Sequence, residues 1–291
     1  MGQNRSRMQK RQPLLVAAAT IAALGLAAVL VGATVIYGGL YDVASTRQHW
    51  QLTHTVLEMA MRQSVKRRAH DIVEPPLADA GMALRGAGCF RDHCVQCHGG
   101  PGVAQEGIGL SMQPLPGPLV DARRHWRARE LYWVTRHGIK MSGMPAWEYR
   151  LTEGELWDVV AFLQRLPDLN AAAYADWMHR APPAPACGRG PDSLAAAAPV
   201  DLARGREALH QYACTACHIV PGLTGSAPHV GPTLEGFAER KLIAGTLANT
   251  PDNRALWLLQ THKVKPGTTM PELGVTPQDA RDMAAYLGTL H

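Results

Sequence analysis

The chain contains one five-residue pattern twice, as CVQCH at residues 94–98 and as CTACH at residues 214–218. Around both copies the same features follow in the same order: an expected leading helix, the pattern, a Gly/Pro-rich loop, a Met-Pro pair and an expected closing helix. This order recurs at a period of about 120 residues, which indicates an internal duplication. The sequence therefore predicts two structural units of one kind.

The pattern C-x-x-C-H is the attachment signature of c-type haem. Two thiols spaced in this way can add across the two vinyl groups of a porphyrin, and the adjacent His98 or His218 then lies under the ring to ligate the iron. The competing interpretations are a zinc knuckle and a redox C-x-x-C pair. A His follows the second Cys in both copies, which favours haem. We therefore expect covalent attachment through Cys94 and Cys97, and through Cys214 and Cys217.

Each unit also has a candidate for the sixth iron ligand. Met144 precedes Pro145, 46 residues after His98, and Met270 precedes Pro271, 52 residues after His218. A single Met is usually core filler, but a Met-Pro pair at matching places in two repeats favours ligands. In the first unit Met141 competes with Met144, and Met112 is a weaker candidate. Methionine ligation would close the iron to substrates and raise its reduction potential.

A ligating His usually donates its second ring N–H to a carbonyl, which fixes the orientation of the ring. Pro232 is placed to supply that carbonyl in the second unit, and Pro118 is the weaker counterpart in the first unit. The two remaining cysteines, Cys89 and Cys187, are expected to form a disulfide, with two free thiols as the alternative.

The predicted fold class is all-α, with one N-terminal transmembrane helix and two tandem haem-bearing units. Gly86 in the first leading helix would let a second helix cross closely, and Gly205 takes the same place in the second leading helix. In the first unit Thr152 and Glu155 form a capping box at the closing helix. The expected helical ranges are 46–73, 77–92, 128–137, 152–166, 201–213, 238–248, 251–261 and a last helix capped by Thr276.

Composition shifts divide the chain into six parts. An Ala- and Pro-rich stretch reads as a partly extended linker between the units. The predicted parts are a basic tail (1–13), a transmembrane anchor (14–41), a juxtamembrane helix (42–76), the first unit (77–169), the linker (170–200) and the second unit (201–291).

The 28 uncharged residues of 14–41 are enough to span ~30 Å of hydrocarbon as a helix. A cleaved signal peptide is the rival interpretation, but its apolar region is normally ~7–15 residues. Arg5, Arg7, Lys10 and Arg11 precede the segment, so the N-terminus is expected in the cytoplasm. The units would then lie in the periplasm, outside a bacterial inner membrane.

The net charge of +5 belongs to the membrane-proximal part of the chain. Residues 1–73 contain nine Lys/Arg against three Asp/Glu, whereas the rest of the chain contains 20 against 21. A basic excess beside an apolar segment is typical of a membrane surface and not of a nucleic-acid interface. We therefore expect a membrane contact and no nucleic-acid partner.

Each unit resembles a class I cytochrome c domain, over about residues 78–168 and 201–290, in its G-x-x-x-aromatic/apolar, C-x-x-C-H and M-P motifs. The second unit, from GPTLEGFAERKLIAG onward at residue 231, resembles the cytochrome c domain fused to subunit II of some bacterial haem-copper cytochrome c oxidases. The first, with HGIKMSGMPAW at residues 137–147, resembles domains of membrane-bound dihaem cytochromes of respiratory oxidases. The resemblance implies the axial ligand pairs His98/Met144 and His218/Met270.

The sequence therefore predicts a membrane-anchored dihaem cytochrome c that transfers single electrons and is not itself an enzyme. The resemblance implies a haem-copper oxidase with a copper-bearing subunit II as the acceptor. This sequence has no Cys/His/Met cluster of the kind that binds copper in subunit II, so the copper centre is expected in the partner. The expected donor is an upstream cytochrome or a quinol-oxidising complex. Two alternatives stay open: an electron-accepting subunit of a periplasmic dehydrogenase, and a dihaem peroxidase, which needs a haem without its sixth ligand.

Overall fold

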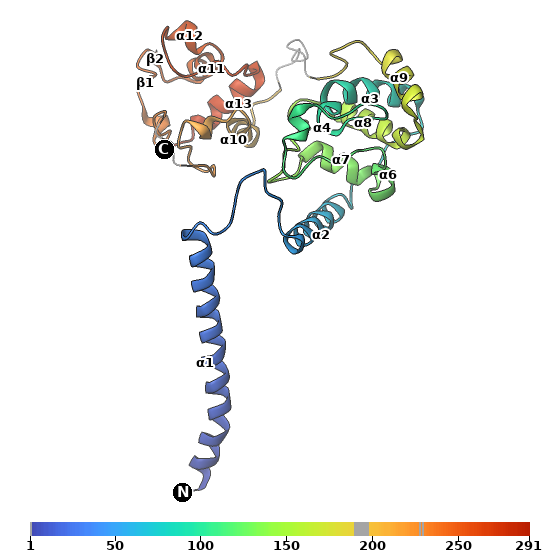
Figure 1. Cartoon of the computed structure of the whole chain (residues 1–291). Helices are drawn as coiled ribbons and strands as arrows, with labels where there is room; N and C mark the ends of the chain where they lie inside the picture. Colours follow the sequence, from blue (N-terminus) through green and yellow to red (C-terminus); the bar gives the residue numbers. More distant parts are fainter. Residues whose placement is uncertain (1, 189–197, 227, 229) are drawn as a thin grey trace.

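The computed structural model describes residues 2–188, 198–226, 228 and 230–291, and the side chains from residue 15 onward together with that of Pro13. The described residues are mostly helical, as predicted, and their one sheet is a two-stranded hairpin. A long N-terminal helix, a shorter second helix and two helical units follow one another along the chain (Figure 1).

Helix α1 (Gly2–Tyr37) contains the predicted apolar segment. Residues Leu15–Tyr37 form a 23-residue stretch with a mean hydropathy of 2.4, of which no part is buried by the rest of the chain. The stretch is long and apolar enough to cross a membrane. The helix ends four residues before the predicted limit of 41, because Gly39 takes a left-handed conformation with φ of 63°.

Helix α2 (Gln51–Arg68) is shorter than the predicted range of 46–73. Trp50 precedes it in an extended conformation, and Ala69 ends it. Near its C-terminal end Val65 is buried, and the Arg62 guanidinium lies 5.1 Å from the ring centroid of Trp126 in the first unit. These contacts attach α2 to the first unit, close to α7 (Ala128–His137).

Two crossing helices form the core of the first unit. They are α3 (Ala80–His93) and α8 (Glu153–Arg165). At the crossing, a Cβ on Gly86 would lie 1.8 Å from the carbonyl oxygen of Asp158, so only glycine permits this approach. Phe90 and Phe162 pack beside it with ring centroids 5.2 Å apart. The expected crossing at Gly86 and the capping box at α8 are both confirmed.

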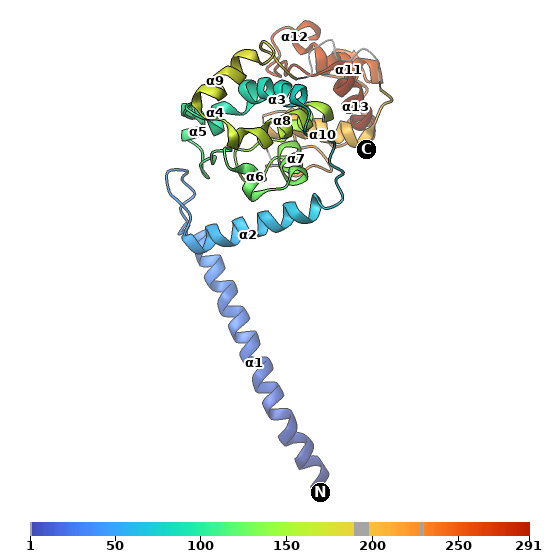
Figure 2. The ribbon, with the colours of Figure 1, turned by 90° about the vertical axis from the view of Figure 1, so that its right-hand side faces the viewer.

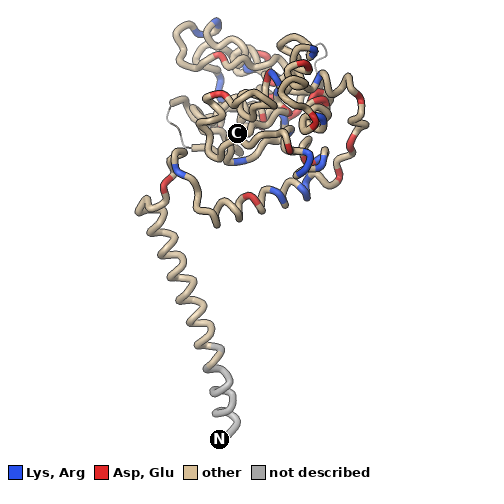
Figure 3. Tube along the Cα trace, turned by 45° about the vertical axis from the view of Figure 1, so that its right-hand side comes forward, with Lys and Arg blue, Asp and Glu red and all other residues tan. Residues whose placement is uncertain are grey.

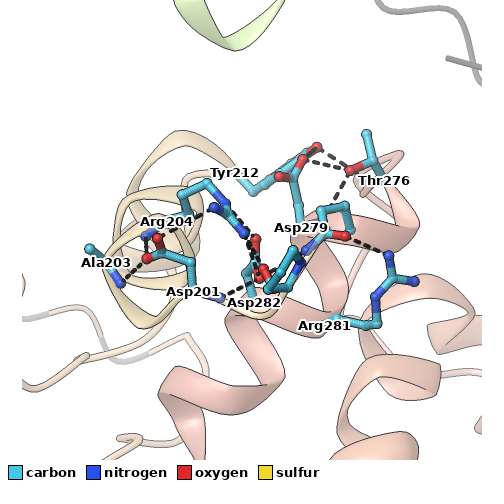
Figure 4. A network of polar contacts seen from close by, with 10 residues as sticks. Asp201, Ala203, Arg204, Tyr212, Thr276, Asp279, Arg281 and Asp282 are labelled. Carbon is cyan, nitrogen blue, oxygen red and sulfur yellow. Dashed lines mark hydrogen bonds and ion pairs between the residues drawn. The ribbon is translucent and has the colours of Figure 1, made fainter. Parts of the chain in front are cut away.

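The second unit repeats this crossing with α10 (Leu202–Gln211) and α13 (Pro277–Leu287). A Cβ on Gly205 would lie 2.0 Å from the carbonyl oxygen of Asp282. The Arg204 guanidinium donates to the buried Asp282 carboxylate at 2.9 Å (Figure 4). Arg85 and Asp158 form the corresponding pair in the first unit. The duplication therefore includes the polar contact that accompanies each helix crossing.

Short elements connect these helices. In the first unit they are α4 (Val95–His98), α5 (Gly107–Leu110), α6 (Ala122–His125), α7, and the 3₁₀ turns η1 (Trp147–Tyr149) and η2 (Leu166–Asp168). In the second unit they are η3 (Cys214–Ala216), η4 (Phe237–Glu239), α11 (Pro251–Leu259) and α12 (Thr261–Val264).

The predicted helix over 238–248 is wrong. After η4 the chain forms a small antiparallel hairpin of β1 (Leu242–Ile243) and β2 (Leu247–Ala248). Its turn holds Ala244 and Gly245 at φ of 51° and 77°, and two successive positive φ values are incompatible with an α-helix. The helix predicted to follow is present as α11.

The predicted linker over 170–200 is also wrong for its described first part. Residues Ala171–Arg180 form helix α9, which Asn170 caps through its side chain. Tyr174 is buried, and Trp177 packs on Phe162 with ring centroids 5.8 Å apart. A disulfide joins Cys187 to Cys89 on α3, as predicted. The first unit therefore continues through residue 188, and residues 189–197 of the predicted linker lie outside the described residues.

The two units contact each other beside η1. The Tyr149 hydroxyl donates a hydrogen bond of 2.7 Å to the carboxylate of Glu207 on α10. The neighbouring Arg150 guanidinium lies 5.9 Å from the ring centroid of Tyr212. The segment after the first Met-Pro pair therefore lies against the leading helix of the second unit.

Candidate haem sites

Each C-x-x-C-H motif forms one tight turn after its leading helix. In the first unit the His98 N–H donates to the Cys94 carbonyl at 3.0 Å, and in the second the His218 N–H donates to the Cys214 carbonyl at 2.8 Å. Such i to i+4 bonds place the first Cys and the His of each motif one helical turn apart. All four motif thiols are free of disulfides. The turn thus presents two thiols and one imidazole together, as haem attachment requires.

Both candidate iron ligands are oriented by a backbone carbonyl. The His218 Nδ1 atom lies 2.7 Å from the Pro232 carbonyl oxygen, as predicted. The His98 Nδ1 atom lies 2.7 Å from the carbonyl oxygen of Gly117 and not of Pro118, so the prediction for Pro118 is wrong by one residue. Pro118 has no N–H and follows the accepting residue directly. In both rings the bond at Nδ1 leaves Nε2 as the ligating atom.

Gly231 lets the loop approach the His218 ring closely. A Cβ on Gly231 would lie 2.4 Å from Cε1 of the His218 ring. No larger residue fits there, so the loop can close over the edge of the imidazole and hold the ring in one plane. The free thiols, the carbonyl-bound imidazoles and this close approach all fit a covalently attached haem.

In the first unit Gln105 holds the corresponding loop. Its side-chain amide donates to the carbonyls of Cys97 at 2.6 Å and Pro116 at 2.5 Å. It therefore bridges the motif to the residue just before Gly117. We did not predict this role, and a lone Gln in a loop has no sequence signal. The second unit uses a backbone bond instead, from the Gly231 N–H to the Cys217 carbonyl at 2.8 Å.

Burial changes the acid–base chemistry of the motif residues. It raises the pKa of the Cys94 thiol to about 12 and that of the Cys214 thiol to about 11. Burial also lowers the pKa of His98, against the opposing effect of its hydrogen bond to Gly117. The neutral imidazole, which can donate its lone pair to iron, is therefore favoured at His98.

The two predicted methionine ligands lie in loops of the same construction. The Met144 N–H donates to the Ser142 hydroxyl at 3.2 Å, and the Met270 N–H donates to the Thr268 hydroxyl at 3.3 Å. Both side chains are half-buried. A hydroxyl two residues before each Met is a shared feature that our sequence analysis missed, although comparing SGMP with TTMP would have revealed it.

The competing methionine of the first unit is in a different environment. Met141 has 93% of its surface exposed and a left-handed φ of 62°. Gly138 makes the Met144 loop possible, because a Cβ there would lie 2.6 Å from the Met144 carbonyl oxygen. Met112 packs against the same loop, since a Cβ on Gly143 would lie 2.5 Å from its sulfur. The geometry therefore favours Met144 over Met141.

The two units of the chain match two different families of known proteins. Residues 81–163 match the family described as cytochrome c oxidase, cbb3-type, subunit III, and residues 202–291 match the cytochrome c family. The chain contains two cytochrome c-type domains. Such domains are electron carriers with covalently bound haem c, so two domains imply two haems. The cytochrome c resemblance of both units is confirmed.

One relative extends the comparison to a complete enzyme subunit. Over 88 residues, or 30% of this chain, the sequence is 35% identical to cytochrome c oxidase subunit 2 of Alkalihalophilus pseudofirmus. The chain spans only 25% of the length of that relative. No solved structure matches the chain. In the described part of the chain, no three His, Cys, Asp or Glu side chains come together as a candidate metal site.

Proposed function

We propose that the chain is a membrane-anchored dihaem cytochrome c that passes single electrons to a respiratory oxidase. One observation carries the proposal: the same set of a C-x-x-C-H turn, a carbonyl-bound His and a hydroxyl-held Met-Pro loop occurs twice. Two such sites in one polypeptide are suited to a relay, because each can accept an electron and pass it on.

In this proposal His98 with Met144, and His218 with Met270, would hold the two haem irons. When bound, each haem would supply a one-electron iron couple, and a methionine sulfur on the iron would raise its potential and leave no open position for a substrate. The carbonyls of Gly117 and Pro232 hold the imidazoles in one orientation, so little rearrangement accompanies a change of charge. A closed site of this kind argues against a peroxidase.

In this proposal the contact between the units would bring the two haem sites near each other. Trp147, three residues after Met144, packs on His93 with ring centroids 4.9 Å apart, and His93 directly precedes Cys94. Tyr149 then bonds to α10, and Tyr212 lies two residues before Cys214. The contact thus joins segments that belong to both haem sites.

A haem-copper oxidase is the proposed acceptor. The similarity to a cytochrome c oxidase subunit 2 supports it, as does the match to the cbb3-type subunit III family. The copper centre that receives the electrons would belong to the partner. An upstream cytochrome or quinol-oxidising complex would be the donor.

Helix α1 is the proposed anchor, in the inner membrane of a bacterium. Its 23-residue apolar span exceeds the ~7–15 residues of a signal-peptide core, which supports an uncleaved segment. The basic residues of 1–13 favour a cytoplasmic N-terminus and periplasmic units.

Purification in mild detergent tests the proposal. We expect a haem-copper oxidase to co-purify, and the reduced protein to be reoxidised by that oxidase in the presence of oxygen. Co-purification with a molybdenum- or quinone-cofactor dehydrogenase that reduces the haems would instead support the reverse direction of electron flow. A protein that purifies alone and diffuses freely between membranes would contradict a bound subunit.

A further inference from the structure

Helix α2 has an apolar face that no described part of the chain covers. Leu52, Val56 and Met59 are exposed to 76%, 57% and 60%. Their spacing of four and three residues places them on one side of the helix. Val65, on the opposite side, is buried against the first unit, and the Arg62 side chain reaches Trp126 of that unit from the flank of the helix. The apolar side therefore points away from the unit that holds the helix.

The same outer side becomes basic toward its C-terminal end. Lys66 and Arg67 lie seven and eight residues after Met59, so they continue the outer face. Both are exposed, and among the described residues neither has an ion-pair partner. Figure 3 shows the basic residues gathered at this end of α2. A stripe of apolar residues followed by basic residues suits a partner surface that is both apolar and negatively charged.

The position of α2 in the chain indicates what covers this face. Only residues 38–50 separate it from α1, the candidate membrane span. Figure 2 shows α2 lying across the end of α1, between α1 and the helices of the first unit. At this junction Trp50 and Tyr37 are exposed to 80% and 91%, and aromatic residues of this kind are enriched at membrane interfaces.

We propose that the outer face of α2 lies on the anionic surface of the bilayer, as a second membrane contact beside α1. Leu52, Val56 and Met59 would enter the boundary between headgroups and acyl chains, and Lys66 and Arg67 would meet anionic headgroups. This contact would fix the first cytochrome c unit at one height above the membrane. The proposal rests on the membrane anchoring proposed for α1.

Site-directed labelling of the full, haem-loaded chain in vesicles tests this proposal. The matched variants are Val56→Cys on the outer face and His54→Cys on the opposite face, and both side chains are exposed in the structure. Haem attachment and the disulfide between Cys89 and Cys187 occupy the native thiols, so a maleimide reports the introduced one. The vesicles contain phosphatidylcholine with or without phosphatidylglycerol, and flotation first selects the vesicle-bound protein.

In vesicles with phosphatidylglycerol, we expect a water-soluble maleimide to modify the Val56→Cys protein about tenfold more slowly than the His54→Cys protein. Each basic residue near an anionic surface strengthens binding roughly fivefold, so adding Lys66→Gln and Arg67→Gln should remove most of this difference. Circular dichroism and the haem spectrum should be unchanged in all variants.

Equal labelling rates at positions 54 and 56 in protein that floats would overturn the proposal and leave the α1 anchor intact. Protection that is the same without phosphatidylglycerol would overturn the role of anionic lipid. Protein that does not float would overturn both the anchor and the α2 contact. The labelling rates do not depend on electron transfer to an oxidase. A failure of the α2 contact can therefore be distinguished from a failure of the proposed function.

Discussion

Replacement of Arg85 by leucine should destabilise the first unit by about 3 kcal/mol. Asp158 is only 6% exposed, and both of its carboxylate oxygens accept from the Arg85 guanidinium at 2.9 Å. Among the described residues Arg85 is the only donor to this carboxylate, so its loss leaves a buried charge unpaired. Breaking such a pair costs ~3–5 kcal/mol. The lower end applies because the Arg85 side chain is 56% exposed.

The second unit offers a matched substitution with a smaller expected effect. Asp282 is completely buried, but it also accepts from the Asp201 N–H at 2.9 Å and from the Gln278 amide at 3.0 Å. Two donors therefore remain when Arg204 is replaced by leucine. We expect Arg204→Leu to lower the free energy of unfolding of the second unit by about 1.5 kcal/mol, the contribution of a hydrogen bond to a charged group.

Hydrogen exchange measured by mass spectrometry separates the two effects, because it reports α3 and α10 individually in the intact, haem-loaded chain. Exchange in α3 should accelerate on Arg85→Leu, while exchange in α10 stays unchanged. Adding Asp158→Asn to Arg85→Leu removes the unpaired charge and should recover a large part of the loss. Equal losses in the two units, or a larger loss on Arg204→Leu, would show that an unpaired Asp158 charge does not determine the loss of stability.

Three further predictions concern the fold and the contact between units. Replacing Cys89 and Cys187 by serine should lower the stability of the first unit by about 4 kcal/mol in guanidinium unfolding, because the disulfide closes a loop of 98 residues; an unchanged midpoint would contradict this. Gly205→Ala should lower the free energy of unfolding by about 1–3 kcal/mol in the same assay, because it forces a Cβ against the α13 backbone. Gly154→Ala should leave the free energy of unfolding unchanged, because the space around Gly154 is open. Burial and the Glu207 carboxylate raise the pKa of Tyr149, so its hydrogen bond should persist at pH 10 and be lost as the pH rises through the raised pKa. Small-angle X-ray scattering should show the units separating only in that alkaline range, and separation at neutral pH would refute this contact.

The duplicated motifs made the main features of each site predictable. Gly86 and Gly205 stand at the same place before each C-x-x-C-H turn, and both prove to be the points where helices touch. The Pro232 carbonyl was predicted because it belongs to a repeated loop. Its counterpart was misplaced by one residue, to Pro118, because the first loop differs in length and composition, and the accepting carbonyl is that of Gly117.

Features without a counterpart in the other unit could not be predicted in this way. Helix α9 was read as a linker because Ala and Pro dominate its neighbourhood, whereas Tyr174 and Trp177 bury it against the first unit. The hairpin of β1 and β2 depends on positive φ values at Ala244 and Gly245, which helix propensity does not reveal. Such contacts depend on tertiary packing, which local sequence patterns record poorly.

The proposed function requires that each of the two irons be held by one His and one Met. The most direct test is the weak red absorption band that a sulfur ligand gives ferric haem, measured on the full chain and on Met144→Ala and Met270→Ala. We predict that each variant loses about half of the band, since each removes one of two equivalent ligands, and that both together lose all of it. A band that keeps its full intensity in either variant would show that the replaced methionine is not an iron ligand.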